Sequence, residues 1–319
     1  MDVYLYEVFE EEAALFQQYV DKRFSYEATS KTIQEAGHKE PPARLISIRT
    51  QSHIPPEWAA HLSGILSRST GYDHLVAFKQ QTGVRIPCGY LDEYATRAVA
   101  EHAVLLILAL FRRLIAQITK FQSFNRDEIT GMECKGRNLL VVGVGRIGAE
   151  ILEIGRGLGM NVRGVDIVRD KHGVEYVSVE EGISWADVIV CSMNLTEENH
   201  RYFSYEILSQ SRAGVIFVNI ARGELSPLKD LLRLLKEGHL GGVGLDVFEN
   251  EGNLALALRS GRASETDIVG VVREMLNYPN VIMTPHNAFN TSEAIKRKTQ
   301  MTIDQILHFQ KHGDFEWKL

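Results

Sequence analysis

The sequence predicts an α/β fold of two domains, with parallel β-sheets that carry helices on both faces. Its 319 residues are many for one domain and sufficient for two. From residue 135 onward, short apolar runs alternate with segments of helical periodicity, a pattern typical of a parallel sheet. A glycine-rich turn follows the first of these runs, as is typical of doubly wound sheets, in which ligands bind beyond the carboxyl ends of the strands.

The residues before position 90 predict a smaller α/β unit. Its expected strands are short apolar runs that end in polar loops: 2–8, 44–49 and 64–67. The acidic run 10–12 is expected to form the solvated first turn of a helix that continues to Val20. The loop with Thr70 and Gly71 follows a strand, and its N–H groups are suited to a small anion such as a carboxylate. An ordinary strand-to-helix turn is the alternative interpretation of that loop.

A strongly apolar helix is predicted over residues 95–117, and the loop 87–94 leads into it. Its composition favours a helix that is buried between domains or subunits. We expect His102 within this helix to be a core histidine with satisfied hydrogen bonds and not a ligand.

The chain after residue 135 supplies the larger sheet. Its expected strands are 139–142, 162–166, 188–192, 215–219, 242–246 and 280–284. One intervening helix has Ser226 as its expected N-cap and Pro227 as its first residue. The last helix opens at 290–293 with a segment that resembles a capping box, and it runs to about His312. Because this helix follows the sixth strand, we expect it to cross back to the first unit, so that the larger domain is inserted into the smaller one.

Three glycines at G-x-G-x-x-G spacing follow the strand 139–142. In this pattern Gly143 permits a tight turn, Gly145 lets the backbone approach a pyrophosphate, and Gly148 allows helix and strand to pack closely. Asp166 ends the next expected strand, where a carboxylate accepts hydrogen bonds from an adenosine ribose and repels a 2′-phosphate. The pattern therefore predicts NAD binding, with a preference over NADP that the neighbouring Arg169 softens.

Composition and charge argue against several other classes of protein. A formal net charge of −6 gives no electrostatic footprint for nucleic acid or for an anionic membrane. Cys88, Cys134 and Cys191 are scattered, so neither a disulfide framework nor a metal site is indicated. The first residues do not resemble a signal peptide, and the most apolar run, 103–111, is too short for a membrane span. We therefore expect a cytoplasmic protein without a metal ion.

Four polar residues follow strands of the larger sheet at the edge where ligands bind: Arg222, Asp246, Glu251 and His286. Each has an ordinary interpretation, namely a cap, a turn residue, a surface acid and a loop residue. Their shared placement at the edge of the glycine turn favours a common chemical role.

Three segments carry a resemblance to a known family. Asn219–Leu225, Gly244–Glu251 and Thr284–Phe289 resemble the signature segments of the D-isomer-specific 2-hydroxyacid dehydrogenases. The similarity spans nearly the whole chain, from Ser67 through the glycine turn to the terminal helix. Within the family, the second and third segments are most similar to those of D-lactate dehydrogenases.

The resemblance implies how the two domains are built. A Rossmann-type doubly wound domain of residues 100–287 would bind NAD, and it would be inserted into a smaller flavodoxin-like domain. The smaller domain, made of residues 1–99 and 288–319, would bind the substrate. The resemblance also implies a homodimer.

The resemblance further implies the roles of individual residues. Arg222, Glu251 and His286 would be catalytic. The residues implied at the cofactor are Gly143, Gly145, Arg146, Ile147, Gly148, Asp166, Asn194, Ala221 and Asp246, the last near the nicotinamide. Those implied at the substrate are Thr70, Gly71, Tyr94, Arg222 and His286. The loop 87–94 is several residues longer than the family pattern, which leaves the role of Tyr94 and the choice of acid open.

The reaction implied is reversible hydride transfer between NAD and a short 2-keto acid, with pyruvate and D-lactate as the first expectation. His286 would donate the proton, Glu251 would orient it, and Arg222 would bind the substrate with its planar fork of donors. Glyoxylate, hydroxypyruvate or phosphoglycerate chemistry are the alternatives within the family, whereas an acidic partner for His286 disfavours formate. A scaffold or corepressor that senses NAD is the alternative from a different class.

Overall fold

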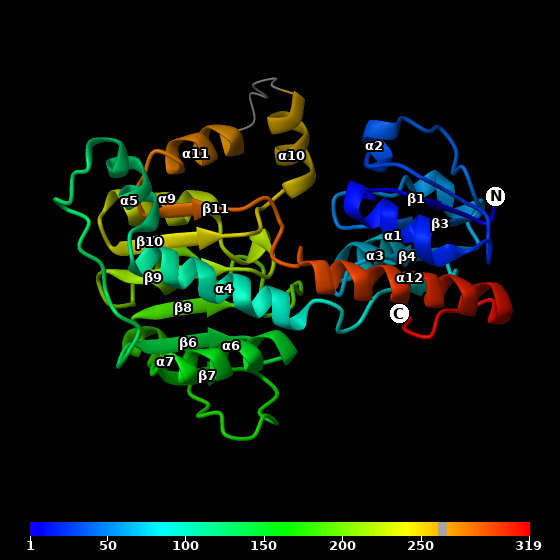
Figure 1. Cartoon of the computed structure of the whole chain (residues 1–319). Helices are drawn as coiled ribbons and strands as arrows, with labels where there is room; N and C mark the ends of the chain where they lie inside the picture. Colours follow the sequence, from blue (N-terminus) through cyan, green and yellow to red (C-terminus); the bar gives the residue numbers. More distant parts are fainter. Residues whose placement is uncertain (261–266) are drawn as a thin grey trace. The chain divides into compact units, whose positions relative to one another are not determined.

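The chain forms two compact units. The computed structural model describes residues 1–260 and 267–319. One unit combines residues 1–95 with residues 290–319, and the other consists of residues 96–289. The first unit is therefore discontinuous, because the chain leaves it after Ala95 and returns to it at Asn290 (Figure 1).

The first unit is built on a sheet of five parallel strands in the order β2-β1-β3-β4-β5. The strands are β1 (Val3–Leu5), β2 (Tyr26–Ala28), β3 (Leu45–Ile48), β4 (Gly64–Ser67) and β5 (Cys88–Gly89). Every residue of β3 and β4 is buried, as expected for parallel strands that are covered on both faces. The strand order is that of flavodoxin-like sheets, and the loop that holds Thr70 and Gly71 leaves the carboxyl end of β4.

The helices of the first unit come from both ends of the chain. They are α1 (Glu10–Val20), α2 (Ile33–Ala36), α3 (Asp73–Thr82), α12 (Ser292–His312) and the 3₁₀ helix η1 (Pro56–Ala60). The hydroxyl of Thr291 caps α12 by accepting a hydrogen bond from Ala294 N at 3.2 Å. Gly313 ends α12 in the left-handed region, with φ of 70°. Since α12 packs against α1, the last residues of the chain complete the unit that the first residues begin.

The second unit is built on six parallel strands in the order β11-β10-β9-β8-β6-β7. They are β6 (Asn138–Val142), β7 (Asn161–Val165), β8 (Val188–Cys191), β9 (Val215–Asn219), β10 (Leu240–Leu245) and β11 (Val281–Met283). The chain turns to one side of β6 to form β7 and then to the other side to form β8. This reversal is the topological switch point at which doubly wound sheets bind ligands.

Helices cover both faces of this sheet. They are α4 (Thr96–Phe111), α5 (Leu114–Lys120), α6 (Arg146–Gly157), α7 (Val179–Trp185), α8 (Tyr205–Leu208), α9 (Leu228–Lys236), α10 (Glu251–Ser260) and α11 (Asp267–Met275), with the 3₁₀ helices η2 (Phe121–Ser123) and η3 (Gly223–Leu225). On one face α6 packs on β6 and β7, while α4 packs on β9 and β10 and against α6. The opposite face carries α7 and α9, and α11 packs against α9 (Figure 1).

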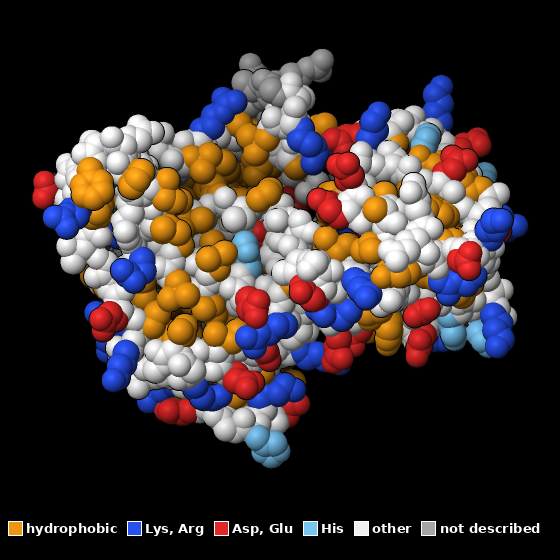
Figure 2. All heavy atoms as spheres, viewed as in Figure 1, with side chains coloured by type: hydrophobic (Ala, Val, Ile, Leu, Met, Phe, Trp, Pro, Cys, Tyr) orange, Lys and Arg blue, Asp and Glu red, His pale blue; other side chains and the backbone are white. Residues whose placement is uncertain are grey.

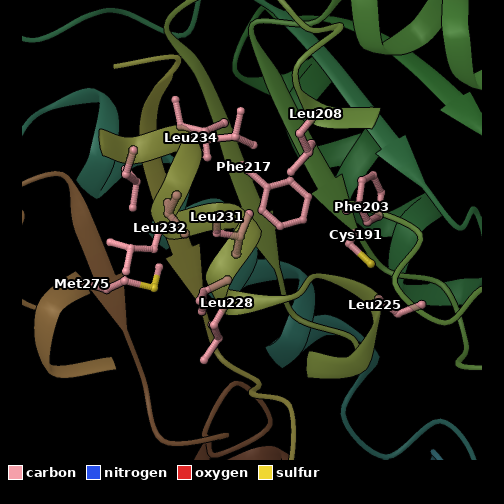
Figure 3. Packing of buried hydrophobic residues seen from close by; sticks show 14 of the residues in the cluster. Cys191, Phe203, Leu208, Phe217, Leu225, Leu228, Leu231, Leu232, Leu234 and Met275 are labelled. Carbon is pink, nitrogen blue, oxygen red and sulfur yellow. The ribbon is translucent and has the colours of Figure 1, made fainter. Parts of the chain in front are cut away.

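The core under α9 shows why this segment is helical. Its buried side chains recur at helical spacing: Leu228, Leu231, Leu232, Leu234 and Leu235. They lie beside Phe217 of β9, whose ring centroid is 5.0 Å from that of Phe203 (Figure 3). Met275 of α11 belongs to the same cluster. The charged residues of α9 occupy the remaining positions, so burial of the leucine face fixes the helix on the sheet.

The structure confirms the predicted fold class, with two parallel sheets that carry helices. Three local predictions are wrong. The acidic run 10–12 is not solvated throughout, because Glu12 is buried and pairs with Arg68 and Lys298. The helix predicted over 95–117 is divided into α4 and α5, because Arg113 adopts a left-handed conformation with φ of 51°. Ser226 does not cap α9, since its hydroxyl accepts a hydrogen bond from Asn219 Nδ2 at 2.7 Å and Pro227 is the N-cap residue. Among the described helices, none is long and apolar enough to cross a membrane.

Candidate active site

The glycine turn between β6 and α6 has the geometry of a phosphate cradle. Gly143 has φ of 95°, and a Cβ there would lie 2.4 Å from the backbone nitrogen of Met193. A Cβ on Gly148 would lie 2.0 Å from the carbonyl oxygen of Gly143, so only glycine lets α6 approach the turn this closely. A Cβ on Gly145, by contrast, would meet no atom within 4 Å. The backbone at Gly145 therefore borders open space, as a site for an approaching pyrophosphate requires.

The start of α6 suits an anion for a second reason. Its N-cap residue is Gly145, which offers no side chain to the N–H groups of the first turn. A helix start of this kind binds phosphate through its N–H groups and the helix dipole. Arg146 is exposed at the first position of α6, and Ile147 is half-buried beside it. Both expected cofactor contacts thus come from the first turn of this helix.

Asp166 lies directly after β7, and its carboxylate is held by the backbone. One oxygen accepts a hydrogen bond from Val144 N at 2.6 Å, and the other accepts one from Val168 N at 2.8 Å. Each oxygen keeps a further lone pair, so the held carboxylate can still accept hydrogen bonds from ribose hydroxyls. Ile167 is fully exposed beside it. The glycine turn, the start of α6 and Asp166 together fit an adenine dinucleotide.

Two further expected cofactor residues follow neighbouring strands of the sheet. Asn194 is exposed beyond β8, and its carbonyl oxygen accepts a hydrogen bond from Asn199 Nδ2 at 2.7 Å. Ala221 is half-buried beyond β9, and its N–H donates to Asn219 Oδ1 at 2.9 Å. Contacts of these residues with a cofactor stay a prediction.

His286 and Glu251 form a close pair. Nδ1 of His286 lies 2.8 and 2.9 Å from the two carboxylate oxygens of Glu251. Both side chains are largely buried, with exposures of 17% and 16%. An ionised carboxylate only accepts hydrogen bonds, so Nδ1 carries a proton in this pair. The pair brings the start of α10 against the loop that follows β11.

Asp246 holds the loop that carries His286. The Asp246 side chain is buried, and one carboxylate oxygen accepts hydrogen bonds from Thr284 Oγ1 at 2.5 Å and from Asn287 N at 2.8 Å. The other oxygen accepts one from Ala288 N at 2.8 Å. His286 itself has φ of 52°, in the left-handed region that side chains with a Cβ rarely adopt. Asp246 therefore fixes both sides of a conformationally strained residue, and its expected contact with the nicotinamide stays a prediction.

Asn219 organises the loop of Arg222. This buried amide at the end of β9 donates to Arg222 O at 2.8 Å and accepts from Ala221 N at 2.9 Å. Arg222 is half-buried, and its Nη1 donates to Ala221 O at 2.8 Å. A Cβ on Gly223 would lie 1.8 Å from the carbonyl carbon of Phe248, so this loop interlocks with the segment that leads to Glu251. Arg222 and Glu251 are thus placed by two loops in direct contact.

The expected substrate residues of the first unit lie in two places. The loop with Thr70 and Gly71 is pinned by Ser69, whose hydroxyl donates to Gly71 O at 2.7 Å and lies 2.6 Å from Ser67 Oγ. Thr70 is exposed on this loop. Tyr94 is only 4% exposed, and its carbonyl oxygen accepts a hydrogen bond from Arg297 Nε at 2.9 Å.

Sequence reasoning did not single out Asn219, Gly223 or Thr284 as residues that build the site. A polar residue at the end of an otherwise apolar strand, as in the run before Asn219, is a signal that could have indicated the first. The role of Gly223 depends on a segment that lies far away in the sequence, and no local pattern indicates it.

The chain is similar to a known protein family and to several known proteins. Residues 104–288 match the family model described as D-isomer specific 2-hydroxyacid dehydrogenase, NAD binding domain. The chain is 33% identical to a D-lactate dehydrogenase of Streptococcus agalactiae, over 78% of this chain and 76% of that protein. It is 30% identical to an aromatic 2-oxoacid reductase of Clostridium sporogenes, over 69% of this chain and 67% of that protein.

A solved structure shows the same architecture. The D-lactate dehydrogenase of Aquifex aeolicus, crystallised with NAD and lactic acid, superposes with a TM-score of 0.87. It is 28% identical to this chain, and the match covers 99% of each chain.

Proposed function

The chain belongs to the D-isomer-specific 2-hydroxyacid dehydrogenases, which are NAD-dependent oxidoreductases, and we propose on that basis that it reduces pyruvate to D-lactate. The observation that carries the proposed chemistry is the His286–Glu251 pair, with Nδ1 2.8 Å from the carboxylate. The choice of pyruvate rests on similarity to the D-lactate dehydrogenases of Streptococcus agalactiae and Aquifex aeolicus.

His286 supplies the proton in this proposal. Bound NADH would provide the hydride that adds to C2 of the keto acid. His286 donates the proton from Nε2 to the carbonyl oxygen, and in the reverse reaction it takes the proton back from the hydroxyl. Such general acid–base catalysis contributes about 10²–10⁴-fold to a rate. Glu251 accepts the hydrogen bond from Nδ1 throughout, which orients the ring.

Arg222 orients the substrate in the same proposal. Its guanidinium is planar and charged, so it can donate two parallel hydrogen bonds to a carboxylate, or to a carboxylate and the neighbouring carbonyl. Asn219 keeps its backbone in place. The N–H groups of Thr70 and Gly71 are further candidates for binding the substrate carboxylate.

A panel of 2-keto acids tests the substrate. Purified protein would be mixed with NADH, or with NADPH in parallel, and with pyruvate, glyoxylate, hydroxypyruvate, 2-ketobutyrate or phenylpyruvate. We expect the highest kcat/KM with pyruvate and NADH, and D-lactate as the only enantiomer of the product. A highest value with phenylpyruvate would place the chain with the aromatic 2-oxoacid reductases, and no turnover in the presence of bound NADH would favour a sensor of NAD.

The variant His286→Ala tests the proposed acid. We expect it to abolish turnover and to leave the Kd for NADH unchanged, because the proton donor is lost while the glycine turn is intact. An equal loss of NADH affinity would contradict this role and indicate a structural one.

We further propose that the protein is a homodimer. Large hydrophobic side chains are exposed along α4, α5 and η2: Leu105, Leu108, Leu114, Ile115, Ile118, Phe121 and Phe124. Figure 2 shows hydrophobic side chains gathered on this side of the second unit. Contiguous patches of this kind mark interaction surfaces, and a second copy of the chain is the partner that the family resemblance favours. Analytical ultracentrifugation should give twice the chain mass of 35.9 kDa.

The expected location is the cytoplasm. The three cysteines are free thiols, and Cys88 and Cys191 are buried, which suits a reducing compartment.

A further inference from the structure

His102 reaches the loop of His286 from a different element. It lies on α4, and its Nε2 is 3.0 Å from Thr284 Oγ1 and 3.7 Å from a carboxylate oxygen of Asp246. Its side chain is 16% exposed. His102 has the satisfied hydrogen bond expected of a core histidine. That bond, to Thr284, also joins α4 to the loop after β11.

The direction of the hydrogen bonds in this chain follows from the chemistry of the groups. Thr284 has one hydroxyl proton, and the acceptor nearest to it is the carboxylate of Asp246 at 2.5 Å. The carbonyl oxygen of Leu245 is farther away, at 3.5 Å. Since the proton of Thr284 is given to Asp246, Thr284 Oγ1 accepts from His102, and Nε2 of His102 carries a proton. The two hydrogen bonds therefore run in series from His102 to Thr284 and from Thr284 to Asp246.

Asp246, the last acceptor in this series of hydrogen bonds, holds the backbone next to His286. Asp246 accepts from the N–H groups of Asn287 and Ala288, directly after His286. On the other side, the N–H of His286 donates to Thr284 O at 2.9 Å. Thr284 and Asp246 therefore bracket a residue in a left-handed conformation, which needs such support to persist.

We propose that His102 is a positioning residue for His286. Its Nε2–H donates to Thr284, which keeps the Thr284 hydroxyl directed at Asp246 and keeps the loop of residues 284–288 in one conformation. The orientation of the His286 ring relative to the substrate then depends on a donor at position 102. This inference rests on the catalytic role proposed above for His286.

Two substitutions at position 102 distinguish a role in hydrogen bonding from a role in packing. His102→Gln keeps an N–H donor at nearly the distance of Nε2, whereas His102→Leu keeps similar bulk and has no donor. We expect His102→Leu to lower kcat about 10- to 100-fold, because a small misplacement of a catalytic group has effects of that size. The KM for NADH and the Kd for NADH should both stay unchanged. His102→Gln should recover most of kcat.

A second site and a control complete the design. Thr284→Val removes the hydroxyl and should lower kcat to a similar degree, which keeps the test available if His102→Leu does not fold. The double variant should be no worse than either single variant, because both interrupt the same chain. Glu101→Gln is the control on the same helix, since the Glu101 side chain is 54% exposed and pairs with Arg97.

Three results would overturn the inference: an unchanged kcat in His102→Leu, an equal loss in His102→Gln, or losses that add in the double variant. Undiminished turnover in the His286→Ala variant would instead overturn the proposed function. The two failures can therefore be told apart.

Discussion

At the scale of single residues, the candidate site depends on side chains that bind backbone. Asn219 holds the backbone on both sides of Arg222, and Asp246 holds the backbone N–H groups of the two residues after His286. Each is a buried polar group at the end of a strand, where its hydrogen bonds go to a loop and not to the sheet. Removing either would leave buried N–H groups without partners, which is more costly than the loss of an exposed contact. The proposed catalytic side chains are therefore held by residues that need not touch a substrate.

Arg222→Lys tests the planar fork of donors. An ammonium cannot donate two parallel hydrogen bonds, and loss of one charge-assisted bond costs about 1.5–3 kcal/mol, or roughly 10- to 100-fold in kcat/KM. We expect a decrease of that size with pyruvate, measured by oxidation of NADH. Arg212→Lys is the matched control, since Arg212 is exposed and pairs with Asp187 in the same unit. Near-normal kcat/KM in Arg222→Lys would refute the assignment.

At the scale of elements, the glycines of the turn between β6 and α6 serve two different purposes, cofactor binding and close packing. Gly148 is required by close packing, whereas the space beside Gly145 is open and its φ of −74° suits any residue. Two glycines of one motif therefore have different reasons to be glycine.

Gly145→Ala should leave folding intact and weaken the binding of the cofactor. We expect an unchanged melting temperature and a Kd for NADH that rises about 10- to 100-fold, because the added methyl group keeps a charged phosphate from the backbone donors. Titration of NADH fluorescence would measure this. Gly157→Ala, at the other end of α6 and also with no atom within 4 Å of an added Cβ, is the control that should keep the Kd for NADH.

The contact between α1 and α12 is the second feature at this scale. Glu12 of α1 accepts hydrogen bonds from Arg68 Nε and from Lys298 Nζ of α12, each at 3.0 Å, and all three side chains are buried. Glu12→Gln leaves two buried cations without their carboxylate, which should cost about 3–5 kcal/mol of unfolding free energy. Urea unfolding would measure this. Glu11→Gln, on the exposed face of the same turn, should change stability little.

The stabilising effect of Glu12 should depend on pH. Burial disfavours its charged form, but the Arg68 guanidinium and the Lys298 ammonium outweigh burial and lower the pKa of Glu12 from 4.5 to about 2. A folded pKa below the unfolded one adds stability above pH 4.5 that is lost as the pH falls towards 2. The difference in unfolding free energy between wild type and Glu12→Gln should therefore shrink from about pH 5 to about pH 3. A difference that is independent of pH would contradict an ionised Glu12.

At the scale of the whole molecule, the proposed dimer would form through the exposed face of α4, α5 and η2. Ile118 is 61% exposed, and Phe121 and Phe124 are still more exposed. Ile118→Glu should shift the sedimentation equilibrium towards the monomer, since a charge would be buried in an apolar interface. Leu276→Glu, at a position that is 56% exposed and outside this face, should keep the dimer. A wild-type mass in both variants would place the dimer interface elsewhere.

Most strands of the molecule could be predicted from sequence, because each is a short apolar run bounded by turn residues. The break at Arg113 could not, since neither glycine nor proline marks it. Ser226 has the sequence of a cap, but a buried amide from the preceding strand takes its hydroxyl. Local preferences are outweighed where a partner from another element competes for the same group.

The candidate site divides in the same way. His286 and Glu251 were predicted by residue type and position at the sheet edge, and the structure brings them together. The contact of His102 with Thr284 joins residues that are 182 positions apart, and no periodicity or motif indicates it. Pairings of this kind follow only from the fold.

The link between Glu12 and Lys298 has a consequence for synthesis on the ribosome. The two residues are 286 positions apart, and at about 5–20 residues per second roughly 15–60 s separate their appearance. During most of that interval β1 to β5 have been made, while α12 is still missing from the nascent chain. The apolar residues that α12 covers stay exposed to water until α12 has been made. The first unit is thus the last to mature, and it is the part of the nascent chain with the longest opportunity to bind a molecular chaperone.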